Sequence, residues 1–499
     1  MDSNASLNRE ENLRSKFYQK LDTIFIIVFC VFYLFNFLGL KELTYLYGLF
    51  LALFSVMIFY LKPAEVLPYF FPFAMIEGQG RILWSYHPVA RLVFDVFLLI
   101  VAFKAFYSNK KLIDTKAVPY YLYIFIILHF TWYFVQLFNP NAISLYAVLT
   151  ATKIYIVPFI LFFSFLTNPG LASDGNIKKI QSLVTLTLFL SSTLAIFQFF
   201  QGDSFITSIN PYYKNILKDA FTGYLYRPFS TTHLPGGYAS YLALFLPLLF
   251  ITKKSSFLQL VIKIVLVILC VYAMFLSQVR SSLIKGILCI VLINLILFLR
   301  GEKKLKRLLS LILLVVTLSG ISLSLNIEQF YQDDIFSTAV DRFLSIGDVK
   351  AVSSSRQGPD KAISFILHNL GENPIGLGPG RTGGVSTLHT STIVNDPVYD
   401  LSYSWAWDNL YISLAIDFGI GMIFYLIAIF LVPIKLLNYT SRRFFSNSEH
   451  LPMITVSAIT TMVILLGNWG GILLPYNPES FCFWYYGALG FKYATKRYT

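Results

Sequence analysis

Residues 257–276 read FLQLVIKIVLVILCVYAMFL, an apolar run whose single charged side chain is Lys263. A hydrocarbon core roughly 30 Å thick is crossed by about 20 helical residues, so this run is long enough to span a membrane. It is continuous and does not alternate polar with apolar residues, which indicates a helix and not a barrel strand. The run therefore predicts a chain built from membrane-spanning helices.

The composition of the whole chain supports the same class. Apolar residues make up 56% of the 499 residues, charged residues 13%, and the mean hydropathy is +0.65. These values lie outside the range of soluble domains. We expect an all-α polytopic integral membrane protein with about 12–14 transmembrane helices. The expected spans are 21–40, 43–61, 88–106, 119–138, 143–166, 179–199, 237–252, 257–276, 281–299, 306–326, 409–434, 451–474 and 478–492.

The stretch 62–87 is ambiguous. Residues 66–84 are apolar but interrupted by prolines and glycines, namely Pro68, Pro72, Gly78 and Gly80. Such breaks are tolerated at membrane depth only inside protein or beside water. The stretch is either a distorted fourteenth span or a re-entrant segment.

The distribution of Lys and Arg predicts the orientation. Basic residues are concentrated in 300–307 and in the loops on the same side, which we therefore place in the cytoplasm. This topology accounts for most of the net charge of +13, so we expect no nucleic-acid partner. It divides the chain into a cytoplasmic N-terminal segment (1–20), a helix bundle (21–326), a large extracytoplasmic loop (327–407) and C-terminal helices with a short cytoplasmic tail (408–499).

Several classes of chemistry lack their motifs. The four cysteines all fall in expected spans and have no CxxC spacing: Cys30, Cys270, Cys289 and Cys482. No glycine-rich phosphate loop of the nucleotide-binding kinds occurs, and no acidic metal-ligand pair is evident. We expect neither a metal ion nor a cofactor.

Ionisable residues at membrane depth are functional candidates by default. Arg280 is the strongest, because it follows the apolar Phe275-Leu276 and precedes the run 281–299. Lys153, inside 143–166, either extends to the membrane surface, binds a carbonyl or contacts a substrate. Arg91 and Asp95 are four residues apart, a spacing typical of a self-neutralising ion pair.

A second candidate site precedes the span 237–252. Residues 226–237 combine Arg227, three hydroxyl residues, His233 and two glycines directly before an expected helix. Free N–H groups and the helix dipole favour anions at such a position. The pattern suggests a phosphate-binding loop.

A third candidate site lies in the polar stretch 327–407. Ser353-Ser354-Ser355-Arg356 precedes an expected amphipathic helix over 360–370, in which Ile363, Ile366 and Leu367 share a face. This face either lies on the membrane or bundle top, or belongs to an ordinary surface helix. His368 and, after a glycine-rich turn, Arg381 are further candidates to contact sugar or phosphate.

Taken in this order, these motifs resemble the O-antigen polymerase/ligase superfamily of bacterial envelope glycosyltransferases, over roughly residues 140–492. The resemblance rests on Arg227 before a new span, the Ser-x-x-Arg-Ser-Ser form around Arg280, the Pro-x-Gly-x-Gly-x-Gly of 374–380, and Asn409 followed by Gly419 and Gly421. The earlier segment 77–84, with Arg81, is similar to one in polysaccharide polymerases of this kind.

The resemblance implies a GT-C-like architecture and a metal-independent, inverting transferase. Its substrate would be an undecaprenyl-pyrophosphate-linked oligosaccharide, polymerised into O-antigen, capsule or exopolysaccharide at the outer face of the bacterial plasma membrane. Flippase and chain-length regulator proteins are further partners that the resemblance implies. Ligases of the superfamily carry His before the Asn, where this chain has Asp408, and this favours a polymerase.

The resemblance also suggests roles for individual residues. Asp408 would be the general base on the acceptor hydroxyl. Arg280 and Arg227 would stabilise the pyrophosphate that leaves, since guanidinium groups bind phosphate oxygens in pairs. The predicted substrate-binding residues are Arg356, Arg381, His368, His233, Asn409, Lys153 and Arg81.

Three alternatives are open. A glycan ligase of the same superfamily would use similar residues. A polytopic transporter would also have many helices and intramembrane charges, but the charged candidates cluster at external ends and no internal repeat is evident. A structural partner in an envelope assembly would leave the Arg and Asp positions unexplained.

Overall fold

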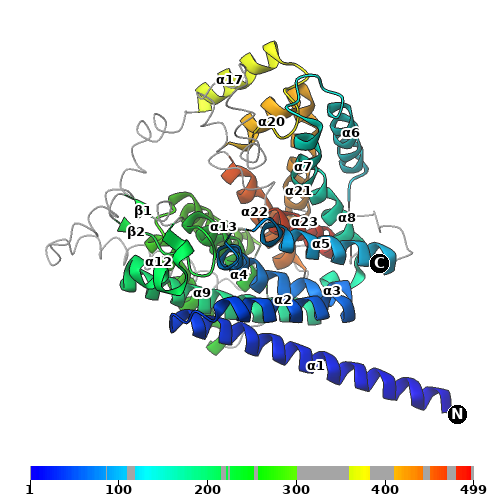
Figure 1. Cartoon of the computed structure of the whole chain (residues 1–499). Helices are drawn as coiled ribbons and strands as arrows, with labels where there is room; N and C mark the ends of the chain where they lie inside the picture. Colours follow the sequence, from blue (N-terminus) through cyan, green and yellow to red (C-terminus); the bar gives the residue numbers. More distant parts are fainter. Residues whose placement is uncertain are drawn as a thin grey trace. The chain divides into compact units, whose positions relative to one another are not determined.

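The computed structural model describes residues 2–85, 87–108, 118–214, 221–222, 225–251, 257–300, 359–382, 409–441, 450–468 and 479–495. Within these residues the regular structure is helical, apart from a short antiparallel pair of β1 (Phe221–Thr222) and β2 (Leu225–Tyr226). Figure 1 shows these elements along the chain. The expected all-α class is confirmed for the described part.

Seven stretches of the described residues are helical, long and apolar enough to cross a membrane, judged by length and composition. Two shorter apolar helices add to them, at Pro235–Phe250 and Leu451–Gly467. These findings support a multi-pass membrane protein. The seven stretches are Lys16–Phe37, Leu43–Tyr60, Leu145–Thr167, Asp174–Ile209, Leu258–Leu276, Arg280–Leu299 and Leu410–Ser441.

The larger expected number of spans stays a prediction. Helices α5 (Pro88–Ser108), α6 (Tyr120–Gln136) and α23 (Glu479–Thr495) form where spans were expected. They are not among the seven, because α6 and α23 have 17 residues each and α5 carries three charged side chains. The expected span 306–326 lies outside the described residues.

The chain divides into two compact units. Unit 1 comprises residues 1–108, 168–245 and 265–277, and unit 2 comprises residues 109–167, 246–264 and 278–499. Helix α12 (Phe257–Leu276) contributes its two halves to different units.

At one end of unit 1, basic side chains form contacts between neighbouring helices. Lys104, near the end of α5, donates to the last carbonyls of α2 (Leu43–Tyr60) and its cap, at 2.7–2.9 Å from Nζ. A cation at that position complements the helix dipole. Lys179, in the second turn of α9 (Asp174–Ile209), lies 3.4 Å from Asp22 of α1 (Asp2–Phe37). The rings of Phe17 on α1 and Tyr60 at the end of α2 are also in contact, with centroids 5.8 Å apart. Residues 17–22 of α1, the start of α9 and the ends of α2 and α5 therefore lie close together. The positive-inside pattern places basic segments of this kind on one membrane face.

The ambiguous stretch 62–87 is helical over 63–83. It consists of α3 (Pro63–Val66), η1 (Leu67–Tyr69) and α4 (Phe70–Leu83). Tyr69 bonds to Asp22 at the basic end of unit 1, whereas α4 leads to the start of α5 at the opposite end. Helix α4 has 14 residues and at roughly 1.5 Å per residue is about 21 Å long. This is shorter than a hydrocarbon core of roughly 30 Å, and both the distorted additional crossing and the re-entrant segment stay predictions.

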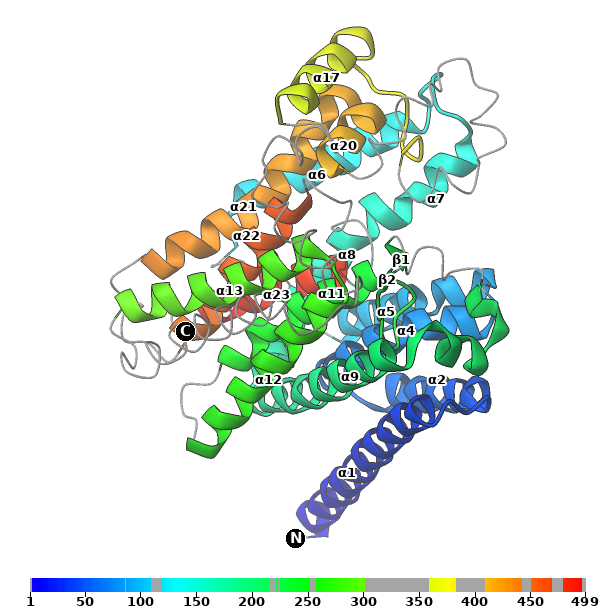
Figure 2. The same cartoon turned by 90° about the vertical axis from the view of Figure 1, so that its left-hand side faces the viewer.

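Unit 2 contains a bundle in which α22 (Leu451–Gly467) packs against α21 (Met422–Ser441), α23 and α13 (Arg280–Leu299). Figure 2 shows these helices side by side. Helix α8 (Val157–Thr167) also packs on α23, and the buried Trp484 ring lies 4.8 Å and 5.1 Å from the rings of Phe159 and Phe162. Large aromatic side chains therefore fill this core.

Two expected spans are interrupted. The run 143–166 forms α7 (Leu145–Tyr155) and α8, with a break at Ile156. Pro158 has no N–H to offer the carbonyl of Ile154, which explains the break. The run 409–434 forms α20 (Leu410–Phe418), a 3₁₀ turn η8 (Gly419–Gly421) and α21. Here Gly419 has a φ of +55°, a conformation that ends the helix.

Other boundaries differ less. The run 237–252 forms α11 (Pro235–Phe245) and a 3₁₀ helix η4 (Leu246–Phe250), and α22 ends at Gly467, before the expected 474. The amphipathic helix is present as α17 (Pro359–Glu372). Its three predicted residues do not share one environment: Ile366 packs against α20, while Ile363 and Leu367 are exposed.

Candidate functional site

In unit 1 the loop before α11 is buried. Ser230, Thr231 and Thr232 are almost inaccessible, and the hydroxyls of the two threonines bond to protein. The side-chain amide of Gln198 exchanges two hydrogen bonds with the backbone of Ser230, at 2.9 and 2.8 Å. The Thr231 hydroxyl donates to the Met75 carbonyl at 2.9 Å. The prediction that these hydroxyls bind an anion is therefore wrong for the two threonines, because their hydroxyls hold the loop in the bundle.

Glycines of α4 make room for this loop. A Cβ on Gly78 would lie 2.4 Å from the backbone nitrogen of His233, and the Gln79 N–H donates to the Thr231 carbonyl at 2.9 Å. The sequence suggested that Gly78 breaks a span, but it lies inside α4 and allows the loop to approach. The glycine thus has a packing role.

A charged group lies beside the loop. Glu77 and Arg81, one turn apart on α4, form an ion pair in which the Glu77 side chain is 2% exposed and that of Arg81 20%. Tyr241 of α11 and Asp95 of α5 also interact electrostatically with Arg81. The sequence predicted that Asp95 and Arg91 neutralise each other. The structure adds an interaction between Asp95 and Arg81.

The start of α11 faces this charged group. A Cβ on Gly237 would lie 4.0 Å from both the His233 ring and the Tyr241 hydroxyl, and Gly236 has no neighbour within 4 Å of its Cβ position. The buried Nδ1 of His233 has no hydrogen-bond partner among the described residues. Burial and the charge of Arg81 lower the pKa of His233 to about 3, so its imidazole is neutral near pH 7. The structure thus brings together His233 and Arg81, two predicted substrate-binding residues.

Arg227 directly follows β2 and is half-buried. It belongs to unit 1, with Arg81 and His233.

In unit 2 the glycine-rich turn packs against the end of α20. Leu377 N–H donates to the Ile416 carbonyl at 2.7 Å, and Ile420 N–H to the Pro374 carbonyl at 2.8 Å. A Cβ on Gly376 would lie 2.5 Å from the backbone nitrogen of Gly419. Two motifs on which the resemblance rests therefore form one joint.

The side chain of Asp417 lies at the centre of this joint and is fully buried. It accepts hydrogen bonds from the Tyr155 hydroxyl and from the backbone and side chain of the segment that holds Arg381. Arg381 itself is 6% exposed. Sequence analysis missed Asp417, although a carboxylate inside the apolar run 409–434 meets the same criterion that selected Lys153.

Helix starts and one helix end meet elsewhere in unit 2. The Tyr411 hydroxyl, at the start of α20, donates to the Leu465 carbonyl at the end of α22 at 2.8 Å. A Cβ on Gly467 would lie 3.1 Å from Nζ of Lys285 on α13, and Lys285 interacts electrostatically with Glu479 at the start of α23. The starts of α13, α20 and α23 thus surround the end of α22. Lys285 and Glu479 were also missed, and both are ionisable residues in expected spans.

Two predicted residues belong to these helix starts. Arg280 is the first residue of α13, and the preceding N-cap, Val279, provides no capping side chain. Asn409 is the N-cap of α20, where its Oδ1 accepts from the N–H groups of Tyr411 and Ile412 at 3.0 and 3.2 Å. The predicted substrate residue Asn409 therefore has a structural task that its carbonyl oxygen performs.

The remaining predicted residues are dispersed. His368 is exposed on α17 and lies 3.2 Å from Glu372. Lys153 is half-buried in the last turn of α7, two residues before Tyr155. Asp408 and Arg356 lie outside the described residues.

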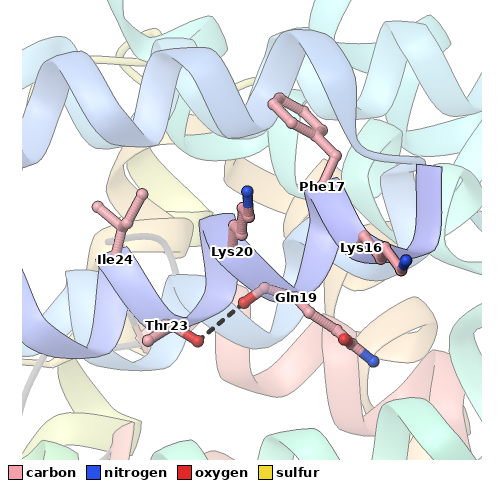
Figure 3. Close-up of a pocket in the computed structure, with 6 residues that line it drawn as sticks. All are labelled: Lys16, Phe17, Gln19, Lys20, Thr23 and Ile24. Carbon is pink, nitrogen blue, oxygen red and sulfur yellow. Dashed lines mark hydrogen bonds between the residues drawn. The ribbon is translucent and has the colours of Figure 1, made fainter. Parts of the chain in front are cut away.

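An open hollow of about 550 Å³ lies beside the first part of α1 (Figure 3). It includes none of the predicted site residues, and its lining comes from three turns of one helix. Lysines at the start of a span commonly extend toward lipid headgroups. The lining residues are Lys16, Phe17, Gln19, Lys20, Thr23 and Ile24.

The described residues contain no group of three or more His, Cys, Asp or Glu side chains arranged to hold a metal ion. Comparison of the chain with models of known protein families and with curated proteins found no match.

Proposed function

We propose that this protein is a membrane glycosyltransferase that polymerises undecaprenyl-pyrophosphate-linked oligosaccharide repeat units into a surface polysaccharide at the outer face of the bacterial plasma membrane. The observation that carries the proposal is the meeting of the α13 and α20 starts around the end of α22 in unit 2. Arg280 and Asn409 come from separate motifs, yet both belong to this group of helix ends. Asp408, the proposed base, directly precedes Asn409 in the chain.

The reaction needs two kinds of group. The acceptor hydroxyl attacks the anomeric carbon of the donor sugar, the bond from that carbon to the pyrophosphate oxygen breaks with inversion, and the hydroxyl proton passes to a base. Asp408 takes this proton, a role typically worth about 10²–10⁴-fold in rate. The lipid pyrophosphate leaves with the bonding electron pair, so its growing negative charge must be stabilised.

Arg280 suits the second task. Val279 offers no side chain to cap the helix, and the first turn of α13 contains no acidic residue. A helix start of this kind favours a phosphate, because its N–H groups and dipole attract anions. A guanidinium in the same turn is suited to bind phosphate oxygens in pairs.

Unit 1 supplies a second group of candidates. The open start of α11 at Gly236, the neutral His233 and the ion-paired Arg81 provide donors suited to sugar or phosphate oxygens. Arg227 lies in the same loop segment. We assign these residues to binding of the lipid-linked substrate.

The proposal is tested with purified protein in nanodiscs and undecaprenyl-pyrophosphate-linked repeat units from its native locus, without nucleotide or added metal. A ladder of glycans of increasing length on a gel would support a polymerase. Transfer of a single block to a non-polyprenyl acceptor would indicate a ligase instead. Absence of product from folded protein and intact native substrate would refute the transferase and favour transport.

Arginine variants test the residue roles. We expect Arg280→Gln to reduce turnover by about 10²–10³-fold, the usual loss when one donor to a developing charge is removed. Arg300→Gln is the matched control, because Arg300 is the C-cap at the other end of α13 and donates to the Ser441 carbonyl. If Arg280→Gln keeps as much activity as the control Arg300→Gln, Arg280 has no catalytic role.

A further inference from the structure

The Asp417 carboxylate accepts four hydrogen bonds. Its Oδ2 accepts from the Tyr155 hydroxyl at 2.9 Å and from Gly380 N–H at 3.2 Å. Its Oδ1 accepts from the N–H and the hydroxyl of Thr382, at 3.1 and 3.0 Å. Each oxygen therefore receives one backbone and one hydroxyl donor, an arrangement that suits a buried carboxylate.

These donors lie on both sides of Arg381. The N–H groups of the residues before and after it point to the same side chain, so the backbone at Arg381 is fixed from both flanks. Gly380 has a φ of +93°, which L side chains rarely adopt, and this allows the chain to wrap around the carboxylate. Tyr155 connects the same carboxylate to α7.

Packing alone does not require a carboxylate at 417. The turn is already held to α20 by backbone bonds, including Gly378 N–H to the Asp417 carbonyl at 3.1 Å. Trp132 adds a bond from its indole N–H to the Phe418 carbonyl at 3.0 Å. Burying a carboxylate is costly, and an apolar residue would fill the same space without that cost. The carboxylate additionally fixes the backbone of residues 380–382 through hydrogen bonds.

We propose that Asp417 is a positioning residue, whose carboxylate fixes the backbone on both sides of Arg381 and so places the Arg381 guanidinium to bind the phosphate of an anionic substrate. This inference rests on the proposed function, a transferase that binds a lipid pyrophosphate, and on the prediction that Arg381 is a substrate-binding residue. Asp417 acts through Arg381 and does not itself touch the substrate.

The test is a double-mutant cycle measured by binding of undecaprenyl pyrophosphate to the full chain in nanodiscs. We expect Arg381→Gln and Asp417→Asn each to weaken binding by about 10- to 100-fold, the usual effect of losing hydrogen bonds to a charged group. If Asp417 acts through Arg381, the double variant binds no more than about twofold more weakly than Arg381→Gln alone. If the double variant loses affinity by the product of the two single losses, the inference is overturned.

Trp132→Phe is the matched control, because it removes a bond to the same joint without touching residues 380–382. We expect it to leave the affinity within about twofold, since its partner is outside the Arg381 segment. A loss equal to that of Asp417→Asn would show a merely structural role and overturn the inference. If Asp417→Asn does not fold, Tyr155→Phe removes one of the four donors and is carried through the same cycle.

The ligand measurement separates the two proposals. Binding by the wild type with losses that multiply would leave the proposed function standing and refute the role of Asp417. No binding of undecaprenyl pyrophosphate by folded wild type would refute the proposed function, and the inference that rests on it.

Discussion

The two units each bury a carboxylate on a helix but satisfy it in different ways. In unit 1 Glu77 pairs with Arg81, a charged side chain one turn away on the same helix. In unit 2 Asp417 bonds to backbone N–H groups and hydroxyls from segments far apart in sequence. In the first arrangement an opposite charge on the same helix balances the carboxylate, whereas the second distributes the cost over several donors. Buried charge can therefore be local in origin or entirely a product of the fold.

The largest effect should come from breaking the ion pair in unit 1. We expect Glu77→Ala to lower the free energy of unfolding by about 3–5 kcal/mol, because Arg81 loses its buried counter-ion. Unfolding in mixed micelles measures this. Glu372→Ala is the matched control, because it breaks another pair with i,i+4 spacing, between His368 and Glu372. These two side chains are 68% and 59% exposed. Similar losses of unfolding free energy in both variants would show that the buried Glu77–Arg81 pair stabilises the protein no more than the exposed pair.

The joint in unit 2 can be broken sterically. Gly376 has a φ of +90°, and a Cβ would lie 2.5 Å from the Gly419 backbone, so Gly376→Ala should destabilise the protein by about 3 kcal/mol. Gly371→Ala, in α17 with no neighbour within 4 Å, should be neutral or slightly stabilising. Thermal unfolding of both variants decides the matter. A tolerated Gly376→Ala would mean that the two motifs are not tightly packed.

The unit 1 site should respond to acid. The pKa of His233 is about 3 in the folded protein and near 6.5 when unfolded, so the unfolded state binds more protons between these values. The stabilisation is complete above about pH 6.5 and is lost as the pH falls toward 3, by at most about 1.4 kcal/mol per pH unit. His233→Gln should flatten the unfolding free energy measured between pH 6.5 and 5. An unchanged slope would contradict a neutral, buried His233.

The smallest effect separates capping from substrate binding at Asn409. Asn409→Ala should cost about 1 kcal/mol, because α20 loses its N-cap acceptor, whereas Asn409→Asp keeps an acceptor oxygen at the same place. Thermal unfolding and glycan products are measured together. A stable but inactive Asp variant would mean that the amide group serves the substrate as well as the helix.

Sequence reasoning predicted the long apolar helices well where nothing interrupts them. The expected spans 257–276 and 281–299 correspond to α12 and α13 within one residue. It failed at Ile156, where the missing N–H of Pro158 ends a helix inside an apolar run. The expected span 409–434 also divides, at Gly419 with its positive φ. Apolar composition reports on the solvent around a segment and contains no signal for such local breaks.

Of the candidate site, sequence identified Arg280, Asn409, His233 and Arg81 as chemically unusual, because polar groups are costly in an apolar chain. It assigned the hydroxyls of Thr231 and Thr232 to a ligand, yet these groups bond to protein. The sequence does not show which polar groups already have a partner, since the partners lie far away along the chain.

The amino-acid sequence by itself determined the membrane class, the helical structure and the residues worth testing, since hydropathy and charge are local properties. Only the tertiary structure decided that the glycine-rich turn meets the end of α20, and that Asp417 holds both flanks of Arg381. Those contacts depend on close backbone approach at Gly376 and Gly419 and on donors from two segments, α7 and residues 380–382. Such long-range packing is set by the folded chain as a whole.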